Sequence, residues 1–164
     1  MKISVAEAAS RLEAQGRLVR YPAKYSENLI ERAREKLGRD LPHDLEEFYR
    51  ERIYRIGDFT LAELSDFPKL LYAQAAPILD DGCGSLFGLD LAVGDATPAV
   101  YFFDHEDEFS RPLWAAGSSL GAFMLLAADH DQAYAEDWPE RWQLSIDPDI
   151  DKCPRAPPIW NTSY

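Results

Sequence analysis

The sequence predicts a single α+β domain with N-terminal helices, an antiparallel meander sheet packed against them, and a closing C-terminal helix. In the first 57 positions, apolar residues recur three or four positions apart, which is the spacing of amphipathic helices. Between positions 76 and 116 they gather instead in short runs that turn residues separate, as in neighbouring antiparallel strands. No repeat or linker divides the chain, so we expect one domain over residues 1–164 with a core at about 26–128.

The N-terminal helices have recognisable start and stop signals. Ser4 and Glu7 form the capping-box pattern of a first helix, and Gly16 ends it. A second helix is expected from the N-cap Ser26 to Gly38. A third opens at Leu41-Pro42, because proline suits the first turn of a helix. Its buried stripe is predicted to comprise Leu45, Phe48, Tyr49 and Ile53.

The remaining elements follow from turn chemistry and short apolar runs. Residues 18–21 are expected to form a short strand or an extended link, and residues 61–71 one more short helix. Four strands are predicted at Ala76–Leu79, Ser85–Leu91, Ala99–Phe103 and Leu113–Ala116. The closing helix runs from Ser118 or Ser119 to about Ala128, and a further helical turn is expected at 137–144. The Pro- and Asp-rich residues 147–164 are expected to be a loosely ordered tail.

The charge of the chain is acidic and unevenly distributed. The formal net charge is −12. Residues 1–57 contain 12 Lys and Arg against 10 Asp and Glu, whereas residues 58–164 contain 5 against 19. Such a field repels nucleic acid and anionic membranes and attracts a basic partner. The alternative explanation of the acidic charge is that it serves only to keep the protein soluble.

Composition also indicates a compartment. No apolar run approaches the roughly 20 residues of a membrane-spanning helix. The first residues, with Glu7 and no long apolar stretch, do not have the form of a signal peptide, so we expect a cytoplasmic protein. Cys83 and Cys153 are far apart in sequence and are expected to be free thiols in a reducing compartment, with a disulfide as the alternative.

One motif points to catalysis but lacks its partners. Residues 117–121 match the G-x-S-x-G pattern of an esterase nucleophile elbow. That chemistry needs an acid and a histidine on later strands, and the chain after Gly121 is predicted to be helix and tail. We therefore expect Ser118 or Ser119 to cap a helix, and we expect no enzyme activity.

Two metal-binding patterns are incomplete. His105-Glu106 begins an H-E-x-x-H motif, but Phe109 stands where the second histidine belongs. Residues 147–151 place three carboxylates like a calcium loop, but Lys152 and Pro158 replace the required glycine and glutamate. Solvated acidic loops are the simpler interpretation, and we expect neither a metal nor a cofactor.

Three blocks of the sequence, taken in order, form a pattern that occurs in a known family. Residues 29–48 contain a Leu-Gly helix stop followed by a Leu-Pro helix start. Residues 78–91 form an Asp/Gly-rich hairpin entering a strand that ends Leu-Asp-Leu. Residues 98–125 form a strand ending in Asp104-His105, followed by paired serines and a helix. Together they resemble the SUKH superfamily, which includes immunity proteins and fungal cell-wall synthesis regulators of the Smi/Knr type.

The resemblance implies a divergent binding scaffold with no catalytic residues to carry over. The leading interpretation is an immunity protein that binds and neutralises a cognate toxin, which the acidic surface suggests is basic, for example a nuclease. The alternative is a non-catalytic scaffold of the cell-wall-regulator type. The expected partner is a protein, not nucleic acid or a membrane, and the oligomeric state stays open. The candidate binding residues flank the predicted strands: Asp80, Asp81, Asp104, Glu106, Asp107 and Glu108.

Overall fold

The protein is built on a seven-stranded antiparallel sheet whose strands follow one another in chain order. The computed structural model describes residues 2–69, 75–91, 97–129 and 141–153. Each strand pairs with the next, so the sheet is a complete meander and the α+β prediction is confirmed. The strands are β1 (Leu18–Arg20), β2 (Ile53–Ile56), β3 (Phe59–Leu61), β4 (Ala75–Asp80), β5 (Leu86–Asp90), β6 (Val100–Phe103) and β7 (Trp114–Gly117).

The helices begin and end close to the predicted signals. They are α1 (Val5–Ala14), α2 (Ser26–Leu37), α3 (His43–Arg50), α4 (Leu120–Ala128) and α5 (Arg141–Ile146). The Ser4 hydroxyl accepts a hydrogen bond from the backbone N–H of Glu7 at 3.2 Å, which satisfies one of the free donors at the start of α1. Gly38 ends α2 in the left-handed conformation, with φ of 63°. Ser26, the predicted N-cap, is instead the first residue of α2, and Tyr25 precedes it.

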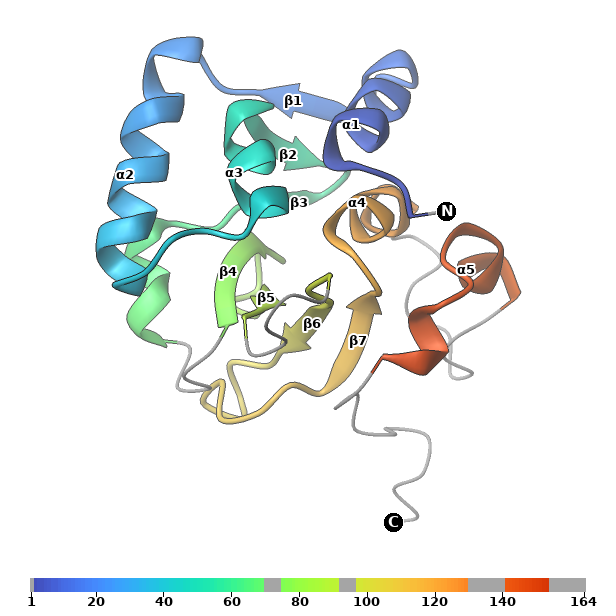
Figure 1. The fold of residues 1–164 in the computed structure, drawn as a ribbon. Coiled ribbons are helices and arrows are strands. Elements are labelled where there is room, and N and C mark those ends of the chain that lie inside the picture. The colour runs from blue at the N-terminus through green and yellow to red at the C-terminus, as the bar shows by residue number, and fades with distance from the viewer. Residues whose placement is uncertain (1, 70–74, 92–96, 130–140, 154–164) are drawn as a thin grey trace.

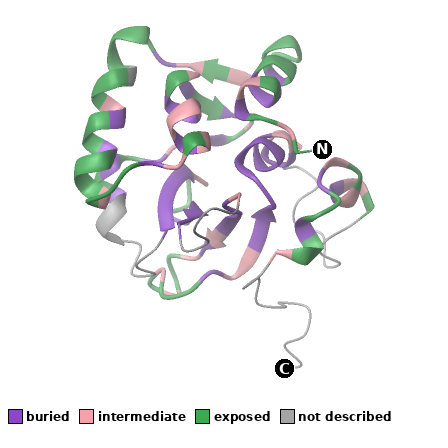
Figure 2. Ribbon diagram, in the orientation of Figure 1, coloured by how far each residue is buried: buried purple, intermediate pink, exposed green. Residues whose placement is uncertain are grey.

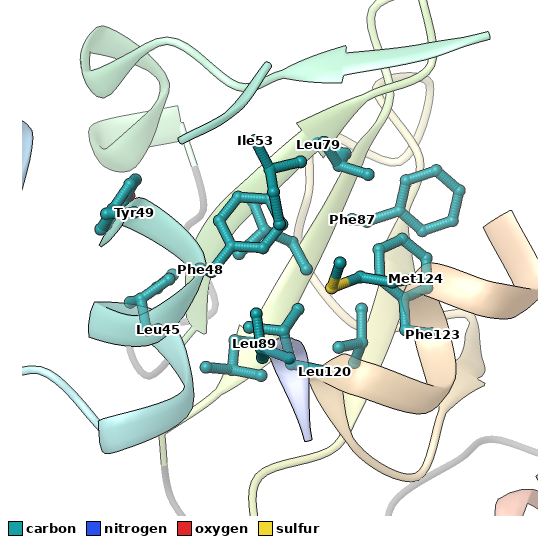
Figure 3. Packing of buried hydrophobic residues seen from close by; sticks show 14 of the residues in the cluster. Leu45, Phe48, Tyr49, Ile53, Leu79, Phe87, Leu89, Leu120, Phe123 and Met124 are labelled. Atoms are coloured by element: carbon teal, nitrogen blue, oxygen red, sulfur yellow. The ribbon is translucent and has the colours of Figure 1, made fainter. Parts of the chain in front are cut away.

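The main core lies between one face of the sheet and a layer of helices. In Figure 1, α3 and α4 lie over the sheet, α1 lies beside α4, and α2 lies beside α3. Helix α4 is buried on almost every side because nearly all its side chains are apolar or small. Figure 3 shows Phe87 of β5 near Phe123 and Met124 of α4, and the centres of the Phe87 and Phe123 rings are 4.9 Å apart. Burial of this apolar surface is the main stabilising term of the fold.

A second, smaller core covers the other face of the central strands. Because side chains alternate along a strand, Phe87 faces the helix layer while Leu86 faces this second core. Gly88 also faces it, and a Cβ atom there would lie 2.9 Å from the Phe103 ring. The members of the second core are Ala62, Ala75, Leu86, Ala99, Tyr101, Phe103, Ala115, Leu126 and Ile150.

A hairpin of two short strands was absent from the sequence prediction. The third helix was expected to run through Ile53, but α3 ends at Arg50 and Ile53 is the first residue of β2. Arg52 makes the change of direction with φ of 59°, a left-handed conformation that the sequence does not signal with glycine. The turn at Gly57 then leads into β3.

The C-terminal part also differs from its prediction. The loosely ordered tail was expected from residue 147, but Asp147 and Ile150 are buried, and Ile150–Lys152 forms a 3-10 helix. The expected helix at 61–71 is a 3-10 helix, Leu64–Lys69, and residues 70–71 lie outside the described part. The helical turn expected at 137–144 corresponds to α5, while residues 137–140 and 154–164 lie outside the described part.

Candidate binding surface

The six acidic residues singled out in the sequence lie on two loops at one end of the sheet. Asp80 pairs with Leu86 across β4 and β5, and Leu86 pairs with Phe103 across β5 and β6. The β4–β5 turn at 80–85 and the segment 104–111 after β6 therefore leave the sheet side by side. We call these two segments the acidic loops. The sheet thus brings together residues that lie more than 20 positions apart in the sequence.

The two acidic loops contact each other through Ser85 and His105. The Ser85 hydroxyl lies 2.9 Å from Nδ1 of His105 and 3.4 Å from Oδ1 of Asp104, and it accepts a hydrogen bond from the His105 N–H at 3.3 Å. Gly84 sits against the imidazole ring, because a Cβ atom there would lie 3.5 Å from Cγ of His105. These contacts fix the position of one loop relative to the other.

Most aspartates of the loops hold the backbone turns. Asp80 accepts a hydrogen bond from the N–H of residue 82 at 2.6 Å. Asp81 accepts from the N–H groups of residue 83 at 2.8 Å and Ser85 at 3.0 Å. Asp104 accepts from the N–H of Glu106 at 2.9 Å. Aspartate commonly stabilises turns in this way, so these side chains shape the loops as well as charge them.

The glutamates of the second loop have no such local role. Much of the segment between β6 and β7 is exposed (Figure 2). Glu106 and Glu108 are exposed, and within the described residues neither carboxylate has a partner. Asp107 instead forms an ion pair with Arg111 at 3.0 Å. Arg111 is the one Lys or Arg residue of the two loops, against six acids. The loops therefore present a fixed negative surface in which Glu106 and Glu108 are available to a cation.

The structure adds an acidic residue that the sequence interpretation did not single out. Thr60 of β3 pairs with Asp80, so the turn that precedes β3 lies beside the 80–85 loop. Asp58 is exposed in that turn. Next to it, Gly57 donates its N–H to the Arg17 carbonyl at 3.1 Å, and Arg17 forms an ion pair with Asp129. Only the pairing of β3 with β4 places Asp58 beside the 80–85 loop. The sequence did not predict β3, so this position could not be inferred from it.

The G-x-S-x-G motif has a structural explanation. The Ser119 hydroxyl accepts the N–H of Ala122 at 3.2 Å and caps α4, as predicted. Ser118 donates its hydroxyl to the buried Asp147 at 2.5 Å. Both serines are buried. A Cβ atom at Gly121 would lie 2.4 Å from the Ile3 carbonyl oxygen, so this glycine allows the start of α1 to approach α4.

The one group of possible metal ligands found among the described residues is on α3 and includes no residue of the acidic loops. His43, Asp44 and Glu47, on α3, bring one ligand atom each within 4.8 Å of one another. His43 is exposed, and such surface groups are common without an ion. The Asp147 carboxylate, part of the incomplete calcium pattern, is already bonded to Ser118.

Both cysteines are free thiols, as predicted. Cys83 is exposed at the tip of the 80–85 loop. Cys153 is partly buried beside the second core, and burial together with the nearby charge of Asp147 raises its pKa to about 12. Its thiol therefore stays protonated and weakly nucleophilic at neutral pH.

The sequence of the chain matches one known protein family. The model of the SMI1 / KNR4 family (SUKH-1) matches residues 24–124, which is more than half of the chain. The chain belongs to the SMI1/KNR4 (SUKH-1) family. The match covers this SUKH protein from the start of α2 into α4, including both acidic loops. No curated protein and no solved structure matches it.

Family membership narrows the kind of activity. SUKH proteins are in general non-catalytic immunity or regulatory proteins that act by binding other proteins. Within the described residues of this SUKH protein, no helix is long and apolar enough to cross a membrane.

Proposed function

We propose that this SUKH protein is an immunity protein that binds and neutralises a cognate toxin with a basic surface, such as a nuclease, in the cytoplasm of the cell that makes the toxin. The single observation that carries the proposal is the pair of acidic loops, which the sheet holds together at one end. The family membership supports a protein partner.

Charge complementarity would serve an immunity protein well. Such a protein must capture its toxin before the toxin reaches a target, so a high association rate matters. Opposite charges on two proteins can raise the association rate constant to about 10⁸–10⁹ M⁻¹s⁻¹ at low salt. Clustered carboxylates repel one another, so the clustering of Glu106 and Glu108 is better explained by binding than by folding.

Co-expression with the product of the neighbouring gene tests the proposal. If that gene encodes a toxin, we expect the toxin alone to stop growth of a host cell and co-expression of this SUKH protein to restore it. The two proteins should then co-purify as a complex. A toxin that remains fully active during co-expression would contradict the proposal.

The family description supports one other function. SMI1 and KNR4 give the family its name, and a non-catalytic regulatory scaffold of that type is the second candidate. A neighbourhood without any toxin gene would favour it.

A further inference from the structure

A groove lined by tyrosines lies between α2 and the segment from β2 to the 3-10 helix at 64–69. It consists of two adjoining hollows of about 430 Å³ and 230 Å³. Both are lined by Leu29, Arg32, Tyr54 and Leu61, so they form one continuous depression. We call it the tyrosine groove. Tyr49 lines the wider part, and Tyr21 and Tyr25 line the narrower part.

The tyrosines combine a rigid floor with exposed rims. Tyr21 is buried and donates its hydroxyl to the Tyr49 carbonyl at 2.6 Å, which fixes the floor. Tyr25 and Tyr54 are 47% and 48% exposed, among the few large apolar side chains of the described surface that water reaches so freely. Exposed tyrosine beside arginine is the composition of binding hot spots, because each gives a large contact area and a polar group.

The narrower part of the groove is positively charged. Arg32 is exposed there, and within the described residues its guanidinium has no carboxylate partner. The Lys24 ammonium lies 4.9 Å from the centre of the Tyr25 ring. Burial raises the pKa of Tyr21 to about 12, and the charge of nearby Arg52 opposes that rise. No acidic residue of the described chain lines this part, whereas Glu63 lines the wider part. The complement of the narrower part is therefore a carboxylate beside an apolar side chain.

We infer that the tyrosine groove binds a segment of the protein partner that places an apolar or aromatic side chain between Tyr25 and Tyr54 and a carboxylate on Arg32. This inference deepens the proposed function, because it rests on a protein partner and assigns a second contact surface. The narrower part of the groove and the acidic loops have opposite charge, so together they favour one orientation of the partner. The acidic loops attract its basic side, and the groove selects one acidic, apolar segment.

A pair of blocked peptides tests the chemistry without the partner. The probes are acetyl-Gly-Trp-Glu-Gly-amide and the same peptide with Gln in place of Glu, each added to the ¹⁵N-labelled full chain. We expect the Glu peptide to shift the backbone amide signals of Tyr25, Leu29 and Tyr54 saturably. The Gln peptide should bind at least about fivefold more weakly, because it lacks the charge that Arg32 recognises.

Two variants on α2 test whether Arg32 is the cation that binds the peptide carboxylate. Arg32→Gln is expected to remove the difference between the peptides. Lys36→Gln makes the same charge change on the same helix outside the groove and should leave the difference intact. Equal affinity for both peptides, or an unchanged difference in Arg32→Gln, would overturn the inference, as would the absence of groove shifts at about 5 mM peptide.

The outcomes separate this inference from the proposed function. The peptides contain no toxin, so their failure to bind leaves the growth-rescue result untouched, and a failed rescue leaves the peptide result untouched. Groove signals that depend on protein concentration without peptide would identify a second copy of the chain as the occupant and would overturn the inference.

Discussion

Replacing Glu106 and Glu108 together by lysine is expected to lower the association rate constant for the toxin by about tenfold or more at low salt. The dissociation rate constant should change far less, because charges at the rim of an interface act mainly on the rate of encounter. The salt dependence of association should also flatten, since salt screens the attraction that the substitution removes.

Glu106 and Glu108 can be substituted without breaking other contacts of the acidic loops. Glu106 and Glu108 are exposed and have no partner in the described chain, so their loss leaves the loop contacts in place. Asp107 is kept because it pairs with Arg111, and Asp104 because it accepts the N–H of residue 106. Stopped-flow measurements at several salt concentrations give the association rate constant and its dependence on salt.

A matched control carries the same charge change elsewhere. Glu31→Lys with Glu35→Lys alters two exposed glutamates of α2 that belong neither to the acidic loops nor to the lining of the tyrosine groove. The control should change association only through net charge, and therefore less than the loop variant does. If both variants slow association equally, net charge and not the acidic loops steers the partner.

The second large effect concerns stability. Asp147→Asn is expected to lower the free energy of unfolding by about 2–3 kcal/mol, because bonds to a buried carboxylate are charge-assisted. Asp147 is 2% exposed and accepts the Ser118 N–H at 2.6 Å and the Ser118 hydroxyl at 2.5 Å. Asparagine keeps the shape but replaces one acceptor oxygen by an NH2 group, which cannot accept the N–H of Ser118 or Asp149, and it removes the charge that strengthens these bonds. Urea denaturation measures the loss.

Asp149→Asn is the control for that measurement. Asp149 lies two residues away, is exposed, and pairs with Lys152 at 3.0 Å. Exposed ion pairs of this kind contribute about 0–1 kcal/mol. Equal losses in the two variants would mean that Asp147 does not anchor the C-terminal part of the chain to the start of α4.

Much of the fold could be predicted because its elements carry local signals. The Ser4 cap, the Gly38 stop and the apolar runs of β4, β5 and β6 are read directly from neighbouring residues. The β2–β3 hairpin lacks such signals. Its strands are only four and three residues long, and Arg52 turns the chain without glycine. Asp147 resembled a tail residue because its partner, Ser118, lies 29 positions away.

The acidic loops and the tyrosine groove also differ in how far the sequence predicts them. The acidic loops were visible in the sequence because each is a local cluster, and the order of β4, β5 and β6 then placed them together. The tyrosine groove takes its residues from three separate segments, at 21–32, 49–54 and 61–65. One of these includes the unpredicted strand β2, so no local pattern could have assembled the groove.

Hydrogen–deuterium exchange of the full chain, alone and with the toxin, tests the central claim most directly. We expect the toxin to slow amide exchange in the acidic loops, residues 80–85 and 104–111, because a bound partner excludes water and restrains local opening. Exchange in α5 should be unchanged. A stable complex in which both acidic loops exchange as fast as in the free protein would contradict the claim that this SUKH protein binds its partner through them.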